Sequence, residues 1–161
     1  MSKAIRLSVM GAGLIGKRHI EQILARPEAG LASIIDPTSA ARELAQSLNV
    51  AWYPFFQDIA PEDRPEGIIV ATPNQMHVAN GMECIEAGLP VLIEKPIADD
   101  LVGAEALVDS AERRGRTATR RTSSPARPND PTRKGGNRQR SPWPDCFSAR
   151  HVLADQTRRL F

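Results

Sequence analysis

Three closely spaced glycines near the start of the chain, Gly11, Gly13 and Gly16, are of a kind that can hold a phosphate group. In a loop between a strand and a helix, the first glycine permits a tight turn and the second lets the main chain approach a pyrophosphate. The third lets the helix pack closely on the strand, and the free N–H groups of the first helical turn face the phosphates. Leu14 and Ile15 lie inside this series and belong to the same predicted cofactor-binding loop. The alternative is a glycine-rich turn without a ligand.

An acidic residue follows at the distance that a dinucleotide-binding loop requires. Asp36 comes 20 residues after Gly16, where a carboxylate would accept hydrogen bonds from the hydroxyls of an adenosine ribose. Residues 37–39 are Pro-Thr-Ser, with no arginine to neutralise an extra phosphate. Because the carboxylate would repel a 2′-phosphate, we expect the cofactor to be NAD rather than NADP.

Two further polar turns follow the fourth and fifth apolar segments. The first covers residues 71–77 and reads Ala-Thr-Pro-Asn-Gln-Met-His. The second covers residues 94–98 and reads Glu-Lys-Pro-Ile-Ala. In an open parallel sheet, the carboxyl ends of the strands form the edge at which ligands bind. Both turns are therefore predicted to lie on the same edge as the glycine loop.

Together with the glycine loop and Asp36, these turns make residues 4–115 resemble the N-terminal nucleotide-binding domain of the glucose–fructose oxidoreductase, inositol 2-dehydrogenase and MocA (Gfo/Idh/MocA) family. The resemblance implies that Lys95 contacts the substrate hydroxyl and assists the catalytic proton transfer. A lysine amine is chemically suited to that role. The alternative for Lys95 is a surface lysine in a turn.

The resemblance also assigns residues to the cofactor. Thr72, Pro73 and Asn74 would line it, and Glu94 would lie near the nicotinamide ribose. Asn74 is also a candidate helix cap, and Glu94 a candidate solvated carboxylate. His77 is open between a cofactor contact and a packed neutral histidine in the first turn of a helix.

In that family, the nicotinamide takes a hydride from a carbon of a sugar or polyol. The substrate lies between this domain and a second domain, which supplies an Asp and a His that have no counterpart here. Family members usually associate through that second domain, so oligomerisation of this chain is doubtful. We expect weak or no NAD binding and negligible turnover from this chain alone.

Five apolar segments alternate with four helical patterns, which predicts an α/β fold: a doubly wound parallel sheet of the Rossmann type, covered on both faces. The predicted strands are Ala4–Met10, Leu31–Ile35, Val50–Tyr53, Gly67–Ala71 and Val91–Ile93, and the predicted helices are Leu14–Ala25, Ser39–Leu48, Asn74–Gly88 and Asp100–Arg114. The third helix is expected to turn Val78, Met82 and Ile85 inward. His19, on the first helix, is expected to be structural.

The composition changes abruptly after residue 115. Residues 1–115 carry a net charge of −6, whereas residues 116–161 carry +8. Only five of the last 46 residues are Leu, Ile, Val or Phe, and no strand pattern continues the sheet. So little apolar surface does not offset the entropy of ordering a chain. We therefore expect one nucleotide-binding domain, residues 1–115, and a basic, disordered tail, residues 116–161.

A displaced reading frame would explain this tail. Codons can be chosen for residues 116–131 that, read one base later, encode Val-Pro-Leu-Leu-Val-Gly-His-His-Arg-Arg-His-Asp-Pro-Met-Ile. Those for residues 152–161 then encode Phe-Trp-Leu-Ile-Lys-Pro-Asp-Asp-Tyr. Both segments resemble the continuation of the family. The alternatives are a genuine basic arm that contacts nucleic acid, or a cofactor-binding subunit whose partner supplies the substrate domain.

Other classes of protein do not fit the sequence. No apolar run reaches the ~18 residues of a membrane span. The apolar run after Arg6 is interrupted by Lys17 and lacks a small-residue cleavage site, unlike a signal peptide. Cys84 and Cys146 have neither the spacing of a metal site nor that of a disulfide framework. We expect a cytoplasmic protein that acts on a small molecule, with no metal, membrane or nucleic-acid partner.

Overall fold

The computed structural model describes residues 4–114 and the main chain of residues 118–120. The elements in chain order are β1 (Ile5–Met10), α1 (Leu14–Leu24), β2 (Ala29–Ile35), α2 (Ser39–Ser47), β3 (Ala51–Tyr53), η1 (Phe56–Asp58), η2 (Pro61–Asp63), β4 (Gly67–Val70), η3 (Asn74–Met76), α3 (His77–Glu86), β5 (Val91–Ile93), α4 (Leu101–Arg113) and β6 (Ala118–Arg120). The three η elements are short 3₁₀ turns.

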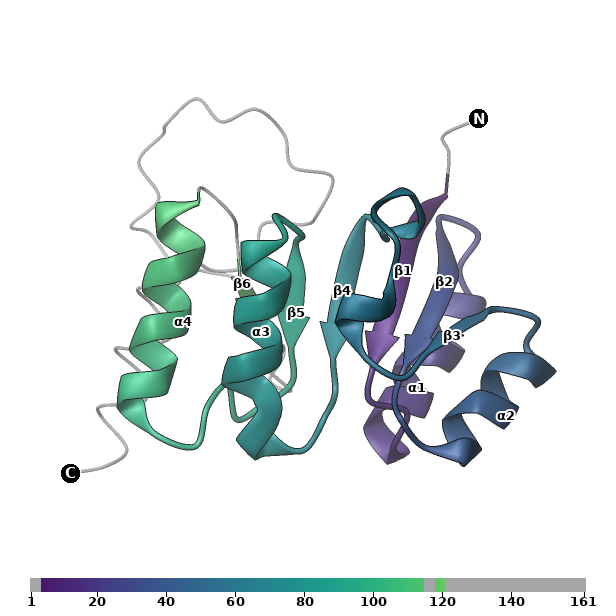
Figure 1. The fold of residues 1–161 in the computed structure, drawn as a ribbon, viewed down its shortest axis with the longest axis horizontal. Coiled ribbons are helices and arrows are strands. Elements are labelled where there is room, and N and C mark those ends of the chain that lie inside the picture. Colours follow the sequence, from purple (N-terminus) through teal and green to yellow (C-terminus); the bar gives the residue numbers. More distant parts are fainter. Residues whose placement is uncertain (1–3, 115–117, 121–161) are drawn as a thin grey trace, which may run out of the picture.

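The strands form one sheet in the order β3-β2-β1-β4-β5-β6, and every neighbouring pair is parallel. From β1 the chain builds outward through β2 to β3, then crosses back to β4 and builds the other way. The strand order therefore reverses between β1 and β4, which is the place where such sheets bind ligands. Figure 1 shows the strands side by side, with α3 and α4 beside β5 and β6. The predicted doubly wound parallel sheet of the Rossmann type is confirmed.

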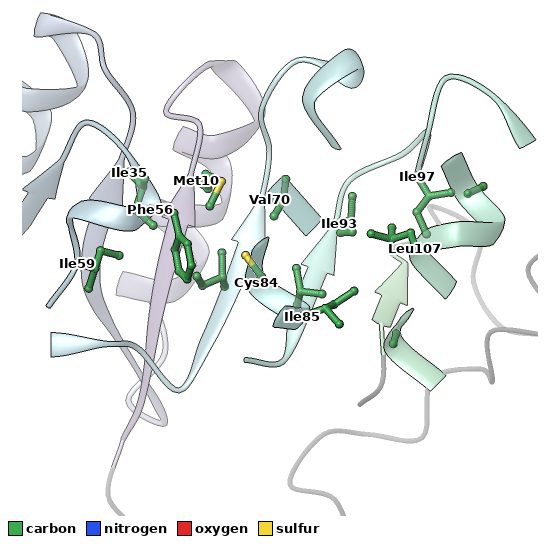
Figure 2. Packing of buried hydrophobic residues seen from close by; sticks show 14 residues of the cluster. Met10, Ile35, Phe56, Ile59, Val70, Cys84, Ile85, Ile93, Ile97 and Leu107 are labelled. Atoms are coloured by element: carbon green, nitrogen blue, oxygen red, sulfur yellow. The ribbon is translucent and has the colours of Figure 1, made fainter. Parts of the chain in front are cut away.

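Each strand turns alternate side chains to opposite faces of the sheet, and each face has its own core. Helices α1 and α2 cover one face, and α3, α4 and η1 cover the other. The α1–α2 core consists of Leu7, Val9, Ala12, Ile20, Ile23, Ile34, Ala41, Ala45 and Ile69. Neighbours on the same strands enter the opposite core, as Met10 and Val70 do (Figure 2). A sheet buried on both faces gives the continuous apolar runs seen in the sequence.

The buried face of α3 differs from the predicted one. Val78 and Met82 are only half-buried, whereas Ile85 is buried as expected. The buried residues of α3 are His77, Asn80, Gly81, Cys84 and Ile85. The prediction followed apolar side chains, but His77 and Asn80 of this helix find hydrogen-bond partners in neighbouring turns and are buried.

Asn74 does not cap α3. Residues Asn74–Met76 form the turn η3, and α3 begins at His77 without a side-chain capping bond. The first turn is wound as a 3₁₀ turn, in which the N–H of Met76 donates to the carbonyl of Pro73 at 2.9 Å. The helix therefore starts three residues later than the sequence pattern suggests, and the Asn74 side chain is left exposed.

The sheet also gains a strand that the sequence analysis did not predict. Ala118–Arg120 pair in parallel with β5, so that Val91 lies opposite Ala118. Strand pairing uses main-chain groups, so an edge strand does not need an apolar side-chain pattern. The rest of the predicted tail, residues 116–117 and 121–161, lies outside the described residues. None of the helices that the structure describes is long and apolar enough to cross a membrane.

Candidate functional site

The glycine loop lies where β1 ends and α1 begins. Gly11 has φ of +90°, and a Cβ there would lie 2.7 Å from the carbonyl oxygen of Ala71. A Cβ on Gly16 would lie 1.8 Å from the carbonyl oxygen of Gly11. By contrast, a Cβ on Gly13 would meet nothing within 4 Å. The packing of the chain itself requires the outer two glycines, whereas the middle one borders open space that fits an approaching ligand.

The N-terminus of α1 has no side-chain cap. The N-terminus of α2 is capped by the hydroxyl of Thr38, which accepts from the N–H of Ala41 at 3.3 Å. The N-terminus of α4 is capped by the carboxylate of Asp100 in the same way. At α1 the cap residue is Gly13, and the first turn contains no acidic residue. The N–H groups of that turn are thus placed to donate to an anion.

Asp36 lies at the end of β2, beside the glycine loop. One carboxylate oxygen accepts from the N–H of Ala12 at 2.8 Å. The other accepts from the N–H of Thr38 at 2.9 Å and from its hydroxyl at 2.6 Å. Partial burial raises the pKa of the Asp36 carboxyl, but these hydrogen bonds outweigh burial and lower that pKa below its usual value. Asp36 is therefore an ionised acceptor at neutral pH, fixed in place by its neighbours.

An aromatic side chain that the sequence analysis did not single out supports Asp36 from β3. The indole N–H of Trp52 donates to the carbonyl oxygen of Asp36 at 2.9 Å. The guanidinium of Arg42 lies 5.3 Å from the centre of the same indole ring, within range of a cation–π interaction. No short motif signals this contact, because Trp52 and Asp36 belong to neighbouring strands.

The turn after β4 is held by α3. The Nε2 atom of His77 lies 2.8 Å from the carbonyl oxygen of Thr72, and the amide of Asn80 donates to the Thr72 hydroxyl at 3.0 Å. The His77 ring is 1% exposed, so it does not line the open edge. Pro73 and Asn74 are exposed at that edge. His77, which the sequence left open between a cofactor contact and a packed histidine, is buried and supports the turn through its contact with Thr72.

The turn after β5 carries Lys95. Its first residue, Glu94, is half-buried and accepts a hydrogen bond from Nε2 of His19 at 2.7 Å. The other Glu94 carboxylate oxygen lies 3.3 Å from the N–H of Lys95. Lys95 is exposed, and a cis peptide bond joins it to Pro96. Glu94 is predicted to lie near the nicotinamide ribose. One of its two carboxylate oxygens is already hydrogen-bonded to His19.

These contacts join the three predicted turns into one edge. The glycine loop touches the turn after β4, because Gly11 approaches Ala71 and Thr72. His19 joins α1 to the turn after β5. His77 joins the turns after β4 and β5, since its Nδ1 atom lies 2.7 Å from the carbonyl oxygen of Pro96. The sequence placed His19 on α1 without a functional role and did not identify Asn80; neither belongs to a recognisable motif.

Two other kinds of chemistry find no support in the part of the chain that the structure describes. No three His, Cys, Asp or Glu side chains there come together as a metal site would require. Burial raises the pKa of the Cys84 thiol to about 12, so that thiol stays protonated and is a poor nucleophile. The open edge with the glycine loop, Asp36 and Lys95 is the candidate site.

The family is decided by comparison with known proteins. A family model described as "Oxidoreductase family, NAD-binding Rossmann fold" matches residues 5–121. The chain belongs to the Gfo/Idh/MocA family. Inositol 2-dehydrogenase from Corynebacterium glutamicum (strain R) is 38% identical over 104 residues, which cover 62% of this chain and 31% of that protein. The rhizopine catabolism protein MocA from Rhizobium meliloti is 30% identical over 108 residues, 67% of this chain and 34% of that protein.

Solved structures agree with this Gfo/Idh/MocA assignment. GenD2 from gentamicin A biosynthesis, solved in complex with NAD, superposes with a TM-score of 0.69 at 26% identity, over 74% of this chain and 35% of GenD2. WlbA from Bordetella pertussis, solved with NADH and UDP-GlcNAcA, gives a TM-score of 0.69 at 25% identity, over 73% of this chain and 37% of WlbA. The domain is therefore an NAD-binding Rossmann domain of an oxidoreductase family. The chain spans about a third of the length of the relatives that it matches.

Proposed function

We propose that this chain is the cofactor-binding part of an NAD-dependent dehydrogenase that oxidises a hydroxyl-bearing carbon of a sugar or polyol. The observation that carries the proposal is the position of Lys95. It lies in the turn after β5, on the edge that also holds the glycine loop and Asp36. The names of the relatives, among them inositol 2-dehydrogenase, support a polyol substrate.

The residues of the site fit NAD. The uncapped first turn of α1 donates N–H groups to the pyrophosphate, and the open space at Gly13 admits it. Asp36 accepts hydrogen bonds from the adenosine ribose. When bound, NAD supplies a nicotinamide ring that accepts a hydride, the hydrogen with its electron pair, from the substrate carbon. Lys95 assists the transfer of the proton from the substrate hydroxyl as that C–O bond becomes a carbonyl.

The relative affinity for NAD and NADP tests the role proposed for Asp36 at the adenosine ribose. Because Asp36 is ionised, its carboxylate would repel a 2′-phosphate, so NAD should bind more tightly than NADP. In the Asp36→Ser variant the preference should narrow or reverse. The control is Glu43→Gln, which removes one negative charge from an exposed position on α2. Amide shifts in an NMR titration detect even weak binding, and equal affinities of the native chain for the two cofactors would contradict the assignment of Asp36.

Lys95 is tested by separating cofactor binding from substrate chemistry. Because Lys95 is assigned to the substrate, the Lys95→Met variant should bind NAD with nearly the native affinity. We also propose that turnover requires acid/base residues of a substrate domain, so the native chain with NAD and myo-inositol should produce no NADH. Absorbance at the NADH band measures this. Steady NADH formation by the native chain would refute the need for a second domain. If Lys95→Met abolished that formation, the proposed role of Lys95 would still stand.

We further propose that residues 116–161 are encoded in a displaced reading frame. The support is the change of net charge from −6 to +8 at residue 116 and the family-like segments that a one-base shift produces. Sequencing the gene across codons 110–165 tests this. A shifted frame that stays open beyond codon 161 is the expected result. Codons that disagree with the shifted segments would refute it, and the basic tail would then be tested for salt-dependent binding to DNA.

A further inference from the structure

The three residues Glu94, Lys95 and Pro96 form a turn, here named the lysine turn, that two buried histidines contact from different helices. Glu94 is tied to the sheet, because its N–H donates to the carbonyl oxygen of Val70 at 3.0 Å. Lys95 itself is exposed. The residues on either side of Lys95, Glu94 and Pro96, each contact one of these histidines.

His19 holds the first end of the turn. Its ring comes from α1, on one face of the sheet, and its side chain is 6% exposed. The Nε2 atom lies 2.7 Å from the carboxylate of Glu94. A carboxylate only accepts, so His19 carries a proton on Nε2 and donates it. This contact spans 75 residues of sequence.

His77 holds the other end. Its ring comes from α3, on the opposite face of the sheet, and it is 1% exposed. Nδ1 lies 2.7 Å from the carbonyl oxygen of Pro96, and Nε2 lies 2.8 Å from that of Thr72. Carbonyl oxygens only accept, so His77 donates to at least one of them. The same ring thereby fastens the lysine turn to the turn after β4.

We propose that His19 and His77 act as a clamp that positions Lys95 for proton transfer. Burying an imidazole is costly unless its polar atoms are hydrogen-bonded, and an apolar side chain would fill either space without that cost. The His19 ring contacts Glu94, before Lys95, and the His77 ring contacts Pro96, after it. The two rings approach from opposite faces of the sheet. The inference rests on the proposed function of Lys95, and it makes the two histidines positioning residues.

The matched variants replace a histidine by glutamine or asparagine, whose side chains end in an amide. Glutamine places an N–H close to the position of histidine Nε2, and asparagine close to that of Nδ1. His77→Asn thus keeps the contact with Pro96 and loses that with Thr72, whereas His77→Gln does the reverse. His19→Gln keeps the donor to Glu94, and His19→Leu removes it with similar volume.

The readout is the order parameter of the Lys95 amide, measured by ¹⁵N relaxation on the whole chain without NAD. In the native chain we expect the value of a rigid backbone, about 0.85. We expect His77→Gln and His19→Leu to lower it below about 0.6, the range of flexible segments, and His77→Asn and His19→Gln to leave it near the native value. The amide of Cys84, in α3, should stay rigid in all four variants.

The clamp is refuted if Lys95 stays rigid in His77→Gln, or if Cys84 loosens as much as Lys95, since the histidines would then merely stabilise the helices. One measurement needs no variant: a ring ¹⁵N spectrum of the native chain in which Nε2 of His19 lacks its proton would also refute the clamp. Failure of the proposed function is seen separately. A titration with NAD that leaves the amide of Gly13 unshifted would reject cofactor binding, while the order of Lys95 would still decide the clamp.

Discussion

The two halves of the sheet build their parts of the site by different means. In the half formed by β1, α1 and β2, the glycine loop offers main-chain groups, and its two outer glycines are fixed by contact with other main-chain atoms. In the half formed by β4, α3 and β5, the turns are held by side chains, those of His19, His77 and Asn80. The first design depends on close contacts between main-chain atoms, whereas the second depends on side chains that reach from one element to another. Substitutions should therefore cost most in the first half.

The largest effect is expected from Gly16→Ala. A Cβ there would lie 1.8 Å from the carbonyl oxygen of Gly11, so that the helix must move away from the strand. We expect the free energy of unfolding to fall by about 3 kcal/mol, at the upper end for overpacking. Urea denaturation of the two proteins measures it. A loss below about 1 kcal/mol would mean that the main chain of the loop moves away from the new methyl group as readily as a flexible side chain would.

Gly13→Ala should separate binding from stability in the same loop. The added Cβ meets no protein atom within 4 Å, so unfolding should change by no more than about 1 kcal/mol, the cost of alanine at a helix cap. Affinity for NAD should fall about tenfold, equivalent to ~1.4 kcal/mol, because the methyl group occupies the approach of the pyrophosphate. Calorimetric titration and denaturation of the same preparation give both values. Unchanged affinity would show that the open space does not receive the cofactor.

A matched glycine substitution in the second half should cost less. In Gly81→Ala, the Cβ would lie 2.7 Å from the Cδ1 atom of Ile93 and 2.8 Å from that of Leu107. Both atoms are ends of side chains that can rotate, and alanine favours a helix over glycine by about 1 kcal/mol. We expect a net loss of about 1 kcal/mol in the same denaturation assay, since strain and propensity oppose each other. A loss equal to that of Gly16→Ala would remove the distinction between the halves.

The smallest effect concerns Asp36 and pH. Its pKa is lower in the folded chain than the ordinary 3.8, so its ionised form stabilises the fold above that value. The stabilisation is lost as pH falls through the lowered pKa. The native chain should thus be more stable than Asp36→Asn at pH 7, and the difference should shrink below about pH 4. Thermal melting at several pH values measures this, and a difference that does not depend on pH would exclude ionised Asp36 as its source.

Most of the first half could be predicted from sequence. The strands appear as apolar runs because both faces of the sheet are buried, and the spacing from Gly16 to Asp36 reflects one βαβ unit. Even so, β2 starts at Ala29, two residues before the predicted Leu31. Pairing of Ala29 with Ile5 extends the strand, and this depends on the neighbouring main chain rather than on local side chains.

The second half was predicted less well because polar side chains are buried there. Apolar periodicity predicted that Val78 and Met82 face inward, whereas the helix buries His77 and Asn80. Their partners lie in turns that become neighbours only when the sheet forms. Apolar character alone does not determine burial either: Leu24 and Leu101, at the ends of α1 and α4, are 53% and 44% exposed.

The hydrogen bond from the N–H of Ala12 to the carboxylate of Asp36 makes the two recognition elements of the cofactor site thermodynamically dependent on each other. A ribose that draws the carboxylate toward itself also acts on the loop that receives the phosphates, and a phosphate that orders the loop acts on the carboxylate. By linkage, the coupling is the same in both directions. Adenosine and pyrophosphate, offered as separate fragments, should therefore each change the affinity for the other by the same factor.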